Sequence, residues 1–370
     1  MISNKKITLL ISSLSGGGAE NVCVNIANKF ADNNWNVDLL VLNLIDETYL
    51  GRLSEKVNLV VLNAKHSRYA GVPLLKYIYK FKSKTYLVFN HELAVILVIL
   101  RFLLRLKINI VSRNISVLSL KFKKFKSENF WVRAIVSPLT KYFYKKIDHV
   151  INQCDSMRED LISIYPQLTN NSNVINNPIS KNIIDYCNKY DLTKIEKKNY
   201  LLCVGRLEEV KSLHYAIEGF AGIAKNFPKL RLKIVGKGNL EQQLKQKALD
   251  LNVYSRVDFE GFQRDIIPYY LYAKATVLTS MYEGYPNVLI ESIAMNTPVV
   301  AFDCPGGTKE IVKDGLNGYL VMYQNVEDLK KKLSIVLFNK FNYKDLKNSV
   351  SKNLIEKVFN QYEKIINSFI

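Results

Sequence analysis

The sequence lacks the residues that build metal or disulfide frameworks. Its 370 residues include only five cysteines and four histidines, and no two cysteines form a CxxC pair. No Asp-x-Asp pair, a common carboxylate motif for divalent cations, occurs in the chain. These absences exclude a zinc domain and a disulfide-stapled secreted fold, and they favour a reducing cytosol.

Long hydrophobic runs are also missing. A membrane-spanning helix needs roughly 18 apolar residues, whereas the longest candidate, LAVILVILRFLL at 93–104, is shorter and is interrupted by Arg101. The opening MISNKKITLLISSLSGGG places two lysines before an apolar run, as a signal peptide does. Its apolar part is only about eight residues long and leads into a glycine cluster, so we predict a first β-strand here.

Acidic residues are scarce in one region. Between residues 65 and 146 there are 18 Lys and Arg but only two acids, Glu92 and Glu128, in a chain whose net charge is +19. Within this region, LKFKKFKSENFWVRAIVSPLTKYFYKK mixes lysine with aromatic residues. Such a mixture is typical of an interfacial membrane surface, and it also suits binding to nucleic acid.

What the chain does contain is a repeated alternation of strand-like and helix-like segments. One series runs from ITLLISSL to HVINQC, and a second runs from YLLCVGRL to GYLVM. The stretch between them, 176–198, loses the apolar periodicity and contains Pro178, as an interdomain linker does. We therefore predict an α/β protein with two doubly wound domains, at 1–180 and 181–350, and a C-terminal helix at 351–370.

Glycine-rich turns follow several of the predicted strands. Such turns let backbone N–H groups approach an anion at a helix N-terminus. Arg206 and Lys211 add cations after the first strand of the second series, where they could clamp a diphosphate. The turns contain these glycines: Gly16, Gly17, Gly18, Gly205, Gly236, Gly238, Gly306 and Gly307.

Two carboxylates stand out in TSMYEGYPNVLIESIAMNTPVVAF. Glu283 lies beside a turn marked by Gly284 and Pro286, whereas Glu291 lies one to two turns into the helix that follows. An acid near a helix N-terminus is ordinarily a dipole or capping partner. A loop at the carboxyl end of a parallel strand is, however, where open α/β sheets bind ligands.

Together these segments resemble a known family. VGRLEEVKS, IVGKGNLEQQLK, FEGF and the stretch from 279 to 321, with its two glutamates separated by seven residues, are similar to the C-terminal half of the retaining glycosyltransferases of family 4. SLSGGGAENVCVNIANKF resembles the N-terminal glycine loop and first helix of that family. The resemblance is dense over 199–322, clear over the first 45 residues and only an outline over 65–175. It implies the GT-B fold, in which two Rossmann-like domains face a central cleft and the C-terminal helix packs back on the N-terminal domain.

The resemblance also implies roles for individual residues. Glu283 is expected to contact the donor sugar and Glu291 to hold the ribose hydroxyls. Arg206 and Lys211 are expected to grip the donor pyrophosphate, and with Glu283 they form the catalytic group. Fixed cations can stabilise the leaving diphosphate in place of a metal, so no metal and no cofactor is expected. The remaining donor-binding residues implied in this way are Gly17, Gly18, Gly306, Gly307 and Thr308.

The sequence departs from the family at two places. Ser212 stands where the family usually has glycine after the lysine. Many members place a histidine at the end of a strand of the N-terminal domain, but IVSRNIS puts Arg113 and Asn114 there. His91, after YLVFN, is a weaker candidate for the acceptor side, because a structural role explains it equally well. No general base is identified.

The sequence thus favours a retaining, metal-independent hexosyltransferase of surface polysaccharide biosynthesis, such as capsule, O-antigen or lipopolysaccharide. The donor is expected to be a UDP-sugar and the acceptor a lipid-linked sugar or other glycan. With this function, the basic region at 65–146 indicates an anionic membrane surface rather than nucleic acid, and a peripheral place on the cytoplasmic face of the membrane. A nucleotide-sugar epimerase of the same fold and a non-catalytic membrane-binding or glycan-binding protein are the alternatives.

Overall fold

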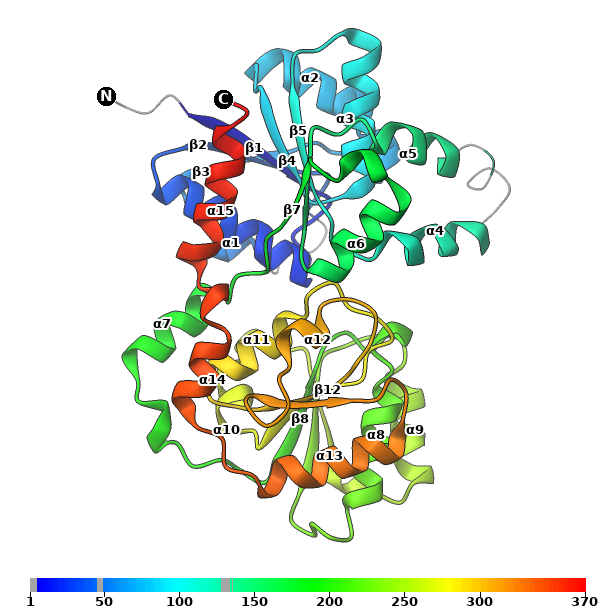
Figure 1. Cartoon of the computed structure of the whole chain (residues 1–370), viewed down its shortest axis with the longest axis vertical. Coiled ribbons are helices and arrows are strands. Elements are labelled where there is room, and N and C mark those ends of the chain that lie inside the picture. Colours follow the sequence, from blue (N-terminus) through cyan, green and yellow to red (C-terminus); the bar gives the residue numbers. More distant parts are fainter. Residues whose placement is uncertain (1–4, 45–48, 128–133, 135) are drawn as a thin grey trace. The chain divides into compact units, whose positions relative to one another are not determined.

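The computed structural model describes residues 5–44, 49–127, 134 and 136–370, with the side chains of 124–127 excepted. The chain divides into two compact units, each built around its own parallel sheet (Figure 1). Unit 1 comprises Met1–Pro178 and Ile355–Ile370, and unit 2 comprises Ile179–Leu354. Two Rossmann-like α/β units agree with the predicted fold class.

Unit 1 holds a seven-stranded sheet in the order β3-β2-β1-β4-β5-β6-β7. Its strands are β1 (Lys6–Ile11), β2 (Asn36–Val41), β3 (Val57–Val61), β4 (Thr85–Val88), β5 (Asn109–Arg113), β6 (His149–Asn152) and β7 (Ser172–Val174). Its helices are α1 (Gly18–Asp32), α2 (Gly71–Phe81), α3 (His91–Leu104), α4 (Leu118–Ser127), α5 (Ser137–Tyr144), α6 (Asp155–Ile164) and α15 (Ile355–Asn367).

Alternate residues of these strands enter two different cores. Leu9 and Leu39 pack with α1 and α15 on one face, whereas their neighbours Leu10 and Leu40 pack with α2, α3 and α6 on the other. Because side chains alternate along a strand, a sheet buried on both faces needs nearly continuous apolar strands. This requirement explains runs such as ITLLI and VDLLV.

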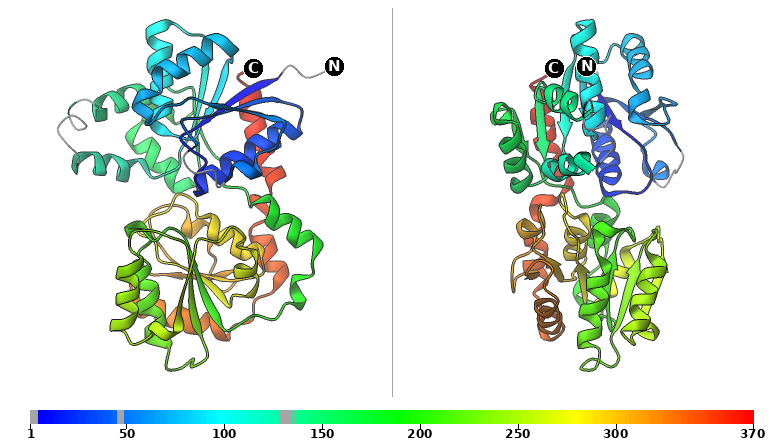
Figure 2. Two further views of the ribbon diagram at one scale, coloured as in Figure 1. Left: turned by 180° about the vertical axis from the view of Figure 1, so that it is seen from behind. Right: turned by 90° about the vertical axis from the view of Figure 1, so that its right-hand side faces the viewer.

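The C-terminal helix α15 completes unit 1. It lies beside α1, as the red and blue ribbons of Figures 1 and 2 show, and Phe359 meets Phe30 edge-on with ring centroids 4.9 Å apart. Trp35 Nε1 donates a hydrogen bond to Glu363 (3.1 Å). The predicted packing of this helix on the N-terminal domain is confirmed.

Unit 2 holds a six-stranded sheet in the order β10-β9-β8-β11-β12-β13. Its strands are β8 (Tyr200–Val204), β9 (Arg231–Val235), β10 (Val257–Gly261), β11 (Ala275–Leu278), β12 (Val299–Phe302) and β13 (Gly318–Val321). Its helices are α7 (Lys181–Lys189), α8 (Leu213–Ile223), α9 (Glu241–Asp250), α10 (Ile267–Tyr272), α11 (Asn287–Ala294), α12 (Thr308–Ile311), α13 (Val326–Phe338) and α14 (Tyr343–Ser349). Helices α8, α9 and α13 share one core with the sheet.

The chain passes from unit 1 to unit 2 between Pro178 and Ile179, inside the predicted linker at 176–198, but much of that stretch is folded rather than extended. It contains α7, whose Ile183 is buried and which packs on α11. Further along, Lys197 Nζ donates to the Leu271 carbonyl (2.8 Å) and to Thr297 Oγ1 (2.6 Å), and burial lowers the pKa of this lysine to about 7. The apolar face of α7 is short, which is why periodicity did not reveal it.

The apolar stretch at 93–104 lies in α3, a helix of 14 residues. Over the described part of the chain, no helix has both the length and the apolar character needed to cross a membrane.

Candidate functional site

The candidate site of unit 2 lies where the order of the strands reverses, between β8 and β11. In an open parallel sheet the loops after two such strands diverge to opposite faces and leave a crevice for a ligand. The loop after β8 carries Arg206 and Lys211, and the loop after β11 carries Glu283.

Lys211 and Glu283 meet in this crevice. Lys211 Nζ donates to Glu283 Oε1 (2.6 Å), and Ser280 Oγ donates to the same oxygen (2.6 Å). The side chains of Lys211 and Glu283 keep only 20% and 12% of their surface exposed. A partly desolvated cation is thus held beside a carboxylate, and a phosphate or a sugar hydroxyl arriving there would find both charges fixed in place.

Gly306 fits against the backbone of this same loop. Its φ is +119°, and a Cβ at this position would lie 1.6 Å from the carbonyl oxygen of Glu283. The Glu283 amide donates to the Pro305 carbonyl (3.0 Å), and the Gly307 amide donates to the Gly284 carbonyl (2.8 Å). Glycine is therefore required at 306 by close packing of two loops, which holds Glu283 in position.

Thr308 begins the short helix α12 and is fully buried. Its hydroxyl lies 3.3 Å from Cys304 Sγ. Any contact of Gly306, Gly307 or Thr308 with a bound nucleotide sugar would therefore come from their backbone rather than from the threonine side chain. The predicted contact of these three residues stays a prediction.

Glu291 is buried on α11, with 8% of its surface exposed. Its carboxylate accepts hydrogen bonds from Ser180 Oγ (2.5 Å) and Tyr270 OH (3.4 Å). These bonds orient the carboxylate, and they also tie α11 to the start of unit 2. The geometry is compatible both with the predicted ribose contact and with a structural anchor.

Arg206 has a different environment. Its side chain is 69% exposed and pairs with Glu208 (Nη1 to Oε1, 2.9 Å). Because an exposed pair of this kind contributes little stability, Arg206 is free to change its partner when an anionic ligand binds. The loops after β8 and β9 pack closely on each other at two glycines, because a Cβ on Gly236, after β9, would lie 1.8 Å from the carbonyl oxygen of Gly205, after β8.

In unit 1 the glycine turn leads into α1 as predicted. Gly17 is the N-cap of that helix, and a Cβ on Gly17 would lie 2.4 Å from Glu20 Oε2. A carboxylate of the first turn therefore lies over the helix N-terminus, a position that favours negative charge. The predicted contact of Gly17 and Gly18 with a donor phosphate is not tested by this geometry.

Arg113 and Asn114, the acceptor-side candidates, are both buried. Arg113 is 1% exposed and donates to Tyr362 OH, Asn177 Oδ1 and the Ile175 carbonyl. Asn114 accepts from Tyr144 OH (2.5 Å) and donates to Asn152 (2.8 Å). These contacts favour structural roles, in which Arg113 joins β5 to the C-terminal helix.

His91 is buried at the start of α3. It packs against Tyr144, with ring centroids 4.1 Å apart and the rings tilted by 33°, and within the described residues neither of its ring nitrogens has a hydrogen-bond partner. Burial, reinforced by Lys121, lowers its pKa well below the ordinary value. A neutral, enclosed imidazole favours the structural reading of this residue.

Sequence reasoning missed the hydroxyl groups that orient the two glutamates. Ser280 stands three residues before Glu283, so TSMYEG offered a local signal for it. Ser180 and Tyr270 reach Glu291 from distant segments, and nothing local indicated them. Across the described residues, no group of three or more His, Cys, Asp and Glu could hold a metal ion.

Comparisons with known proteins agree with this architecture. The family model "Glycosyltransferase Family 4" matches residues 16–182, and "Glycosyl transferases group 1" matches residues 188–356. An uncharacterised glycosyltransferase of Haemophilus influenzae is 26% identical, with 98% of this chain and 100% of that protein covered. A Campylobacter jejuni N-acetylgalactosamine-N,N'-diacetylbacillosaminyl-diphospho-undecaprenol 4-alpha-N-acetylgalactosaminyltransferase is 25% identical, with 90% of both chains covered.

Solved structures share the fold. HepE of Anabaena, in complex with UDP and glucose, has a TM-score of 0.77 at 19% identity, with 99% of this chain and 100% of that chain covered. Sucrose-phosphate synthase of Thermosynechococcus elongatus has a TM-score of 0.79 at 17% identity, with 99% of each chain covered. Since the two family models together span nearly the whole chain, it belongs to the family 4 glycosyltransferases of the GT-B fold.

Proposed function

We propose that this chain moves a sugar, with retention of anomeric configuration, from a UDP-linked donor to a lipid-linked or other glycan acceptor of a surface polysaccharide. The observation that carries the proposal is the pair Lys211–Glu283, fixed at 2.6 Å and packed against Gly306 at the carboxyl ends of β8 and β11. A cation and a hydrogen-bond acceptor held together suit a donor that carries both a diphosphate and a sugar.

The reaction breaks the bond between the anomeric carbon and a phosphate oxygen, so negative charge develops on the leaving diphosphate. Lys211 is already in place to stabilise that charge, and Arg206 can leave Glu208 to join it. Glu283 then binds hydroxyls of the donor sugar, and Glu291 binds the ribose. Because two cations serve the leaving group, the reaction is proposed to need neither a metal nor a cofactor.

The names of relatives support both the proposed retention of anomeric configuration and the proposed lipid-linked or glycan acceptor. The Campylobacter relative is named for an alpha linkage and a diphospho-undecaprenol acceptor, and a Bacillus subtilis relative is a poly(glycerol-phosphate) alpha-glucosyltransferase. An alpha-linked nucleotide sugar that gives an alpha-linked product has retained its configuration. A lipid-linked acceptor also lies at a membrane, which the charge of unit 1 suits.

We further propose that residues 65–146 hold the protein on the anionic, cytoplasmic face of the membrane. Exposed lysines of this region include Lys65, Lys76, Lys80, Lys82, Lys84, Lys107, Lys123, Lys141 and Lys145. Each Lys or Arg near an anionic bilayer contributes about 1 kcal/mol, so several together give stable attachment.

A screen of nucleotide sugars against polyprenyl-diphosphate-linked acceptors, with products detected by mass spectrometry, tests the function. We expect transfer from a UDP-sugar, an alpha linkage by NMR, and activity that survives EDTA. Isomerised sugar without transfer would identify an epimerase, and the absence of any turnover would favour a non-catalytic binding protein. Loss of activity on chelation, restored by magnesium or manganese, would overturn the proposed metal independence.

A further inference from the structure

Helix α3 of unit 1 ends in an apolar turn that faces solvent. Phe102, Leu103 and Leu104 are 59%, 68% and 43% exposed. They follow a stretch whose Leu93, Leu97 and Val98 lie fully in the core, so the helix changes from buried to exposed without becoming polar. Single exposed apolar residues are ordinary, but three in succession at a helix end indicate a surface that a membrane or another protein covers.

The neighbouring helix α5 extends this apolar turn. Tyr142 of α5 is 49% exposed. Lys146 contacts both α3 and α5, because its Nζ lies 4.6 Å from the ring centroid of Phe102 and 4.7 Å from the ring centroid of Tyr142. Phe102 also meets Phe143 edge-on at 6.1 Å. Phe102, Leu103, Leu104 and Tyr142 therefore form one cluster, which we call the α3 tip.

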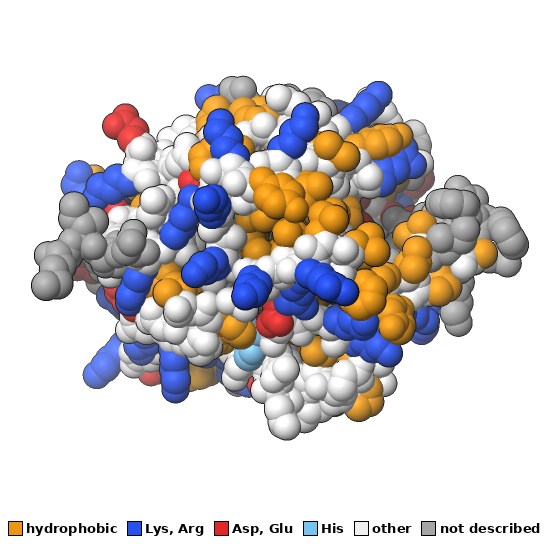
Figure 3. Space-filling view, turned by 90° about the horizontal axis from the view of Figure 1, so that it is seen from above, with side chains coloured by type: hydrophobic (Ala, Val, Ile, Leu, Met, Phe, Trp, Pro, Cys, Tyr) orange, Lys and Arg blue, Asp and Glu red, His pale blue; other side chains and the backbone are white. Residues whose placement is uncertain are grey.

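The surroundings of the α3 tip are basic. Exposed cations adjoin it along the chain: Arg105 and Lys107 follow α3, Lys141 lies on α5, and Lys145 follows α5 directly. Asp148, the first acid after this region, pairs with Arg101 and is bonded to the Ile110 amide. Figure 3 shows apolar side chains gathered among many Lys and Arg and few acids on the face seen from above.

Helix α4 does not present a comparable apolar surface through Phe122, contrary to the expectation from its sequence. Phe122 is 7% exposed and packs on His91, and Lys121 pairs with Glu92 (2.9 Å). The other residues of the basic and aromatic stretch at 120–146 that bear on this point lie outside the described side chains: Lys124, Phe125, Lys126, Phe130 and Trp131.

We infer that the α3 tip is the edge of unit 1 that inserts into the interfacial layer of an anionic bilayer, while the surrounding lysines contact lipid phosphates. This inference rests on the proposed membrane location and names the residues that enter the lipid. Aromatic and aliphatic side chains flanked by lysine match the composition of interfacial anchors, in which long lysine stems keep the charge at the headgroups. A second copy of the chain fits less well, because two basic rims would face each other.

The first test replaces the apolar side chains without changing charge. The triple variant Phe102→Gln, Leu103→Gln, Leu104→Gln keeps residues that favour a helix, and the matched control Leu249→Gln, Met322→Gln, Phe338→Gln removes exposed apolar side chains of unit 2. Sedimentation with phosphatidylglycerol-containing vesicles should show the first variant at least about tenfold weaker than the parent, since its apolar insertion is lost. The control should bind like the parent.

The second test reports insertion directly. Leu103→Trp should show a blue-shifted emission with anionic vesicles and quenching by brominated lipids, after subtraction of the parent signal. Parent-like binding of the triple variant, or vesicle binding of Leu103→Trp without quenching, would overturn the inference. A dimer that the triple variant abolishes, with vesicle binding unchanged, would instead make the tip a subunit interface.

Donor hydrolysis measured on the same samples separates this inference from the proposed function. Weaker vesicle binding of the triple variant with parental hydrolysis supports the inference. A parent that binds vesicles through the tip but neither hydrolyses nor transfers any sugar would overturn the proposed reaction and leave the insertion edge standing. A parent that does not bind anionic vesicles at all would overturn both the membrane location and the inference.

Discussion

Ser212 adopts a left-handed backbone, with φ 43° and ψ 44°, as the N-cap of α8. This conformation costs an L-residue roughly 1–2 kcal/mol, and glycine avoids the cost, which gives a physical reason for the family's glycine at this position. The Ser212 hydroxyl recovers part of the cost by donating to the Glu209 carbonyl (3.0 Å).

We expect Ser212→Ala to destabilise unit 2, because it keeps the strained backbone and loses the hydrogen bond. Ser212→Gly should be more stable than Ser212→Ala by about 1 kcal/mol, since glycine relieves the strain. Urea unfolding of the parent and both variants measures the difference. Equal stability of the glycine and alanine variants would show that the left-handed backbone carries no cost.

Glu283 and Glu291 should differ in what they contribute to turnover. Glu283→Gln keeps a side chain that can bond Lys211 and Ser280 but removes the charge, and we expect kcat to fall about a hundredfold with little change in nucleotide affinity. Glu291→Gln should mainly weaken nucleotide affinity. Steady-state kinetics and UDP titration calorimetry distinguish the two, and small, equal effects on both would contradict the assigned roles.

The neutral, buried His91 should make stability depend on pH. Its folded pKa is below the ordinary value of about 6.5, so the unfolded chain binds the proton more readily and stability falls as pH drops below about 6.5. His91→Phe keeps an aromatic ring beside Tyr144 and removes the titration. As the pH falls from 6.5 to 5, the parent should therefore lose stability relative to the variant. Urea denaturation midpoints of both proteins measure this change, and a difference between the midpoints that stays constant with pH would exclude the effect.

Among the elements, the C-terminal helix depends on one buried cation. Arg113 donates to Tyr362 on α15, and Val358, Phe359 and Ile366 of the same helix are core residues of unit 1. Tyr362→Phe keeps the ring and removes an acceptor from a buried guanidinium, so it should cost about 1–3 kcal/mol. Tyr190→Phe, at an exposed position, should change stability by less than about 0.5 kcal/mol. Thermal unfolding of both variants measures the difference. If Tyr362→Phe were as mild as Tyr190→Phe, the hydrogen bonds of Arg113 to other residues would suffice without the helix.

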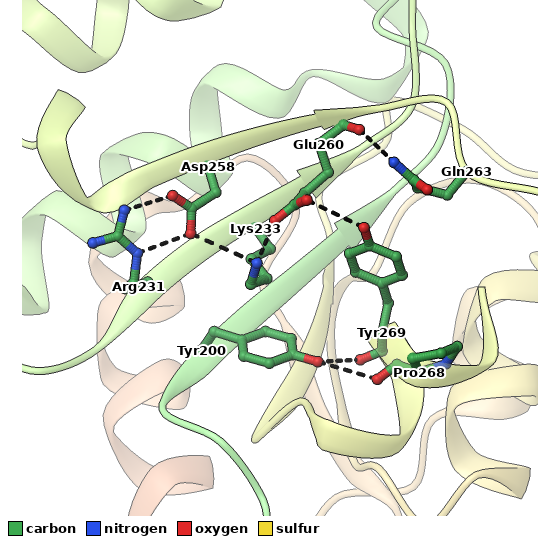
Figure 4. A network of polar contacts seen from close by, with 8 residues as sticks. All are labelled: Tyr200, Arg231, Lys233, Asp258, Glu260, Gln263, Pro268 and Tyr269. Carbon is green, nitrogen blue, oxygen red and sulfur yellow. Dashed lines mark hydrogen bonds and ion pairs between the residues drawn. The ribbon is translucent and has the colours of Figure 1, made fainter. Parts of the chain in front are cut away.

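The edge strand β10 illustrates a different use of charge. Arg231 and Lys233 of β9 face Asp258 and Glu260 of β10, and Tyr269 donates to Glu260 (Figure 4). Tyr200 lies beside this group and donates to the Tyr269 carbonyl (2.7 Å). Because alternate residues share a face of a strand, the charges form a ladder beside an otherwise unpaired edge, which discourages the pairing of this edge with another chain.

The sequence predicted the elements better than the contacts between them. Apolar runs and glycine turns placed the strands of both units except β7, because strand burial and turn geometry are local requirements, whereas β7 has only three residues. The residues that orient Glu291, at 180 and 270, are distant in sequence and meet it only through the fold. Burial of Arg113 and Phe122 was missed for the same reason, since a charged or Lys-flanked residue is expected at the surface until its tertiary partners are known.

For the molecule as a whole, the location of its charge should matter more than the total. Most of the +19 net charge arises between residues 65 and 146 of unit 1. We compare two double variants that change the net charge equally. The first combines Lys107→Glu with Lys145→Glu, beside the α3 tip, and the second combines Lys331→Glu with Lys340→Glu, in unit 2. At about 1 kcal/mol for each lysine near an anionic bilayer, the first double variant should bind phosphatidylglycerol vesicles about thirtyfold more weakly than the parent.

The second double variant, in unit 2, should retain nearly parental binding, and both should hydrolyse the donor at the parental rate. Attraction to lipid phosphates fades within a Debye length of about 8 Å at physiological salt, so raising the salt should release the parent and narrow the difference between the variants. Co-sedimentation over a series of salt concentrations measures this. Equal losses from the two double variants would show that net charge alone drives attachment, and the basic region of unit 1 would then need another explanation.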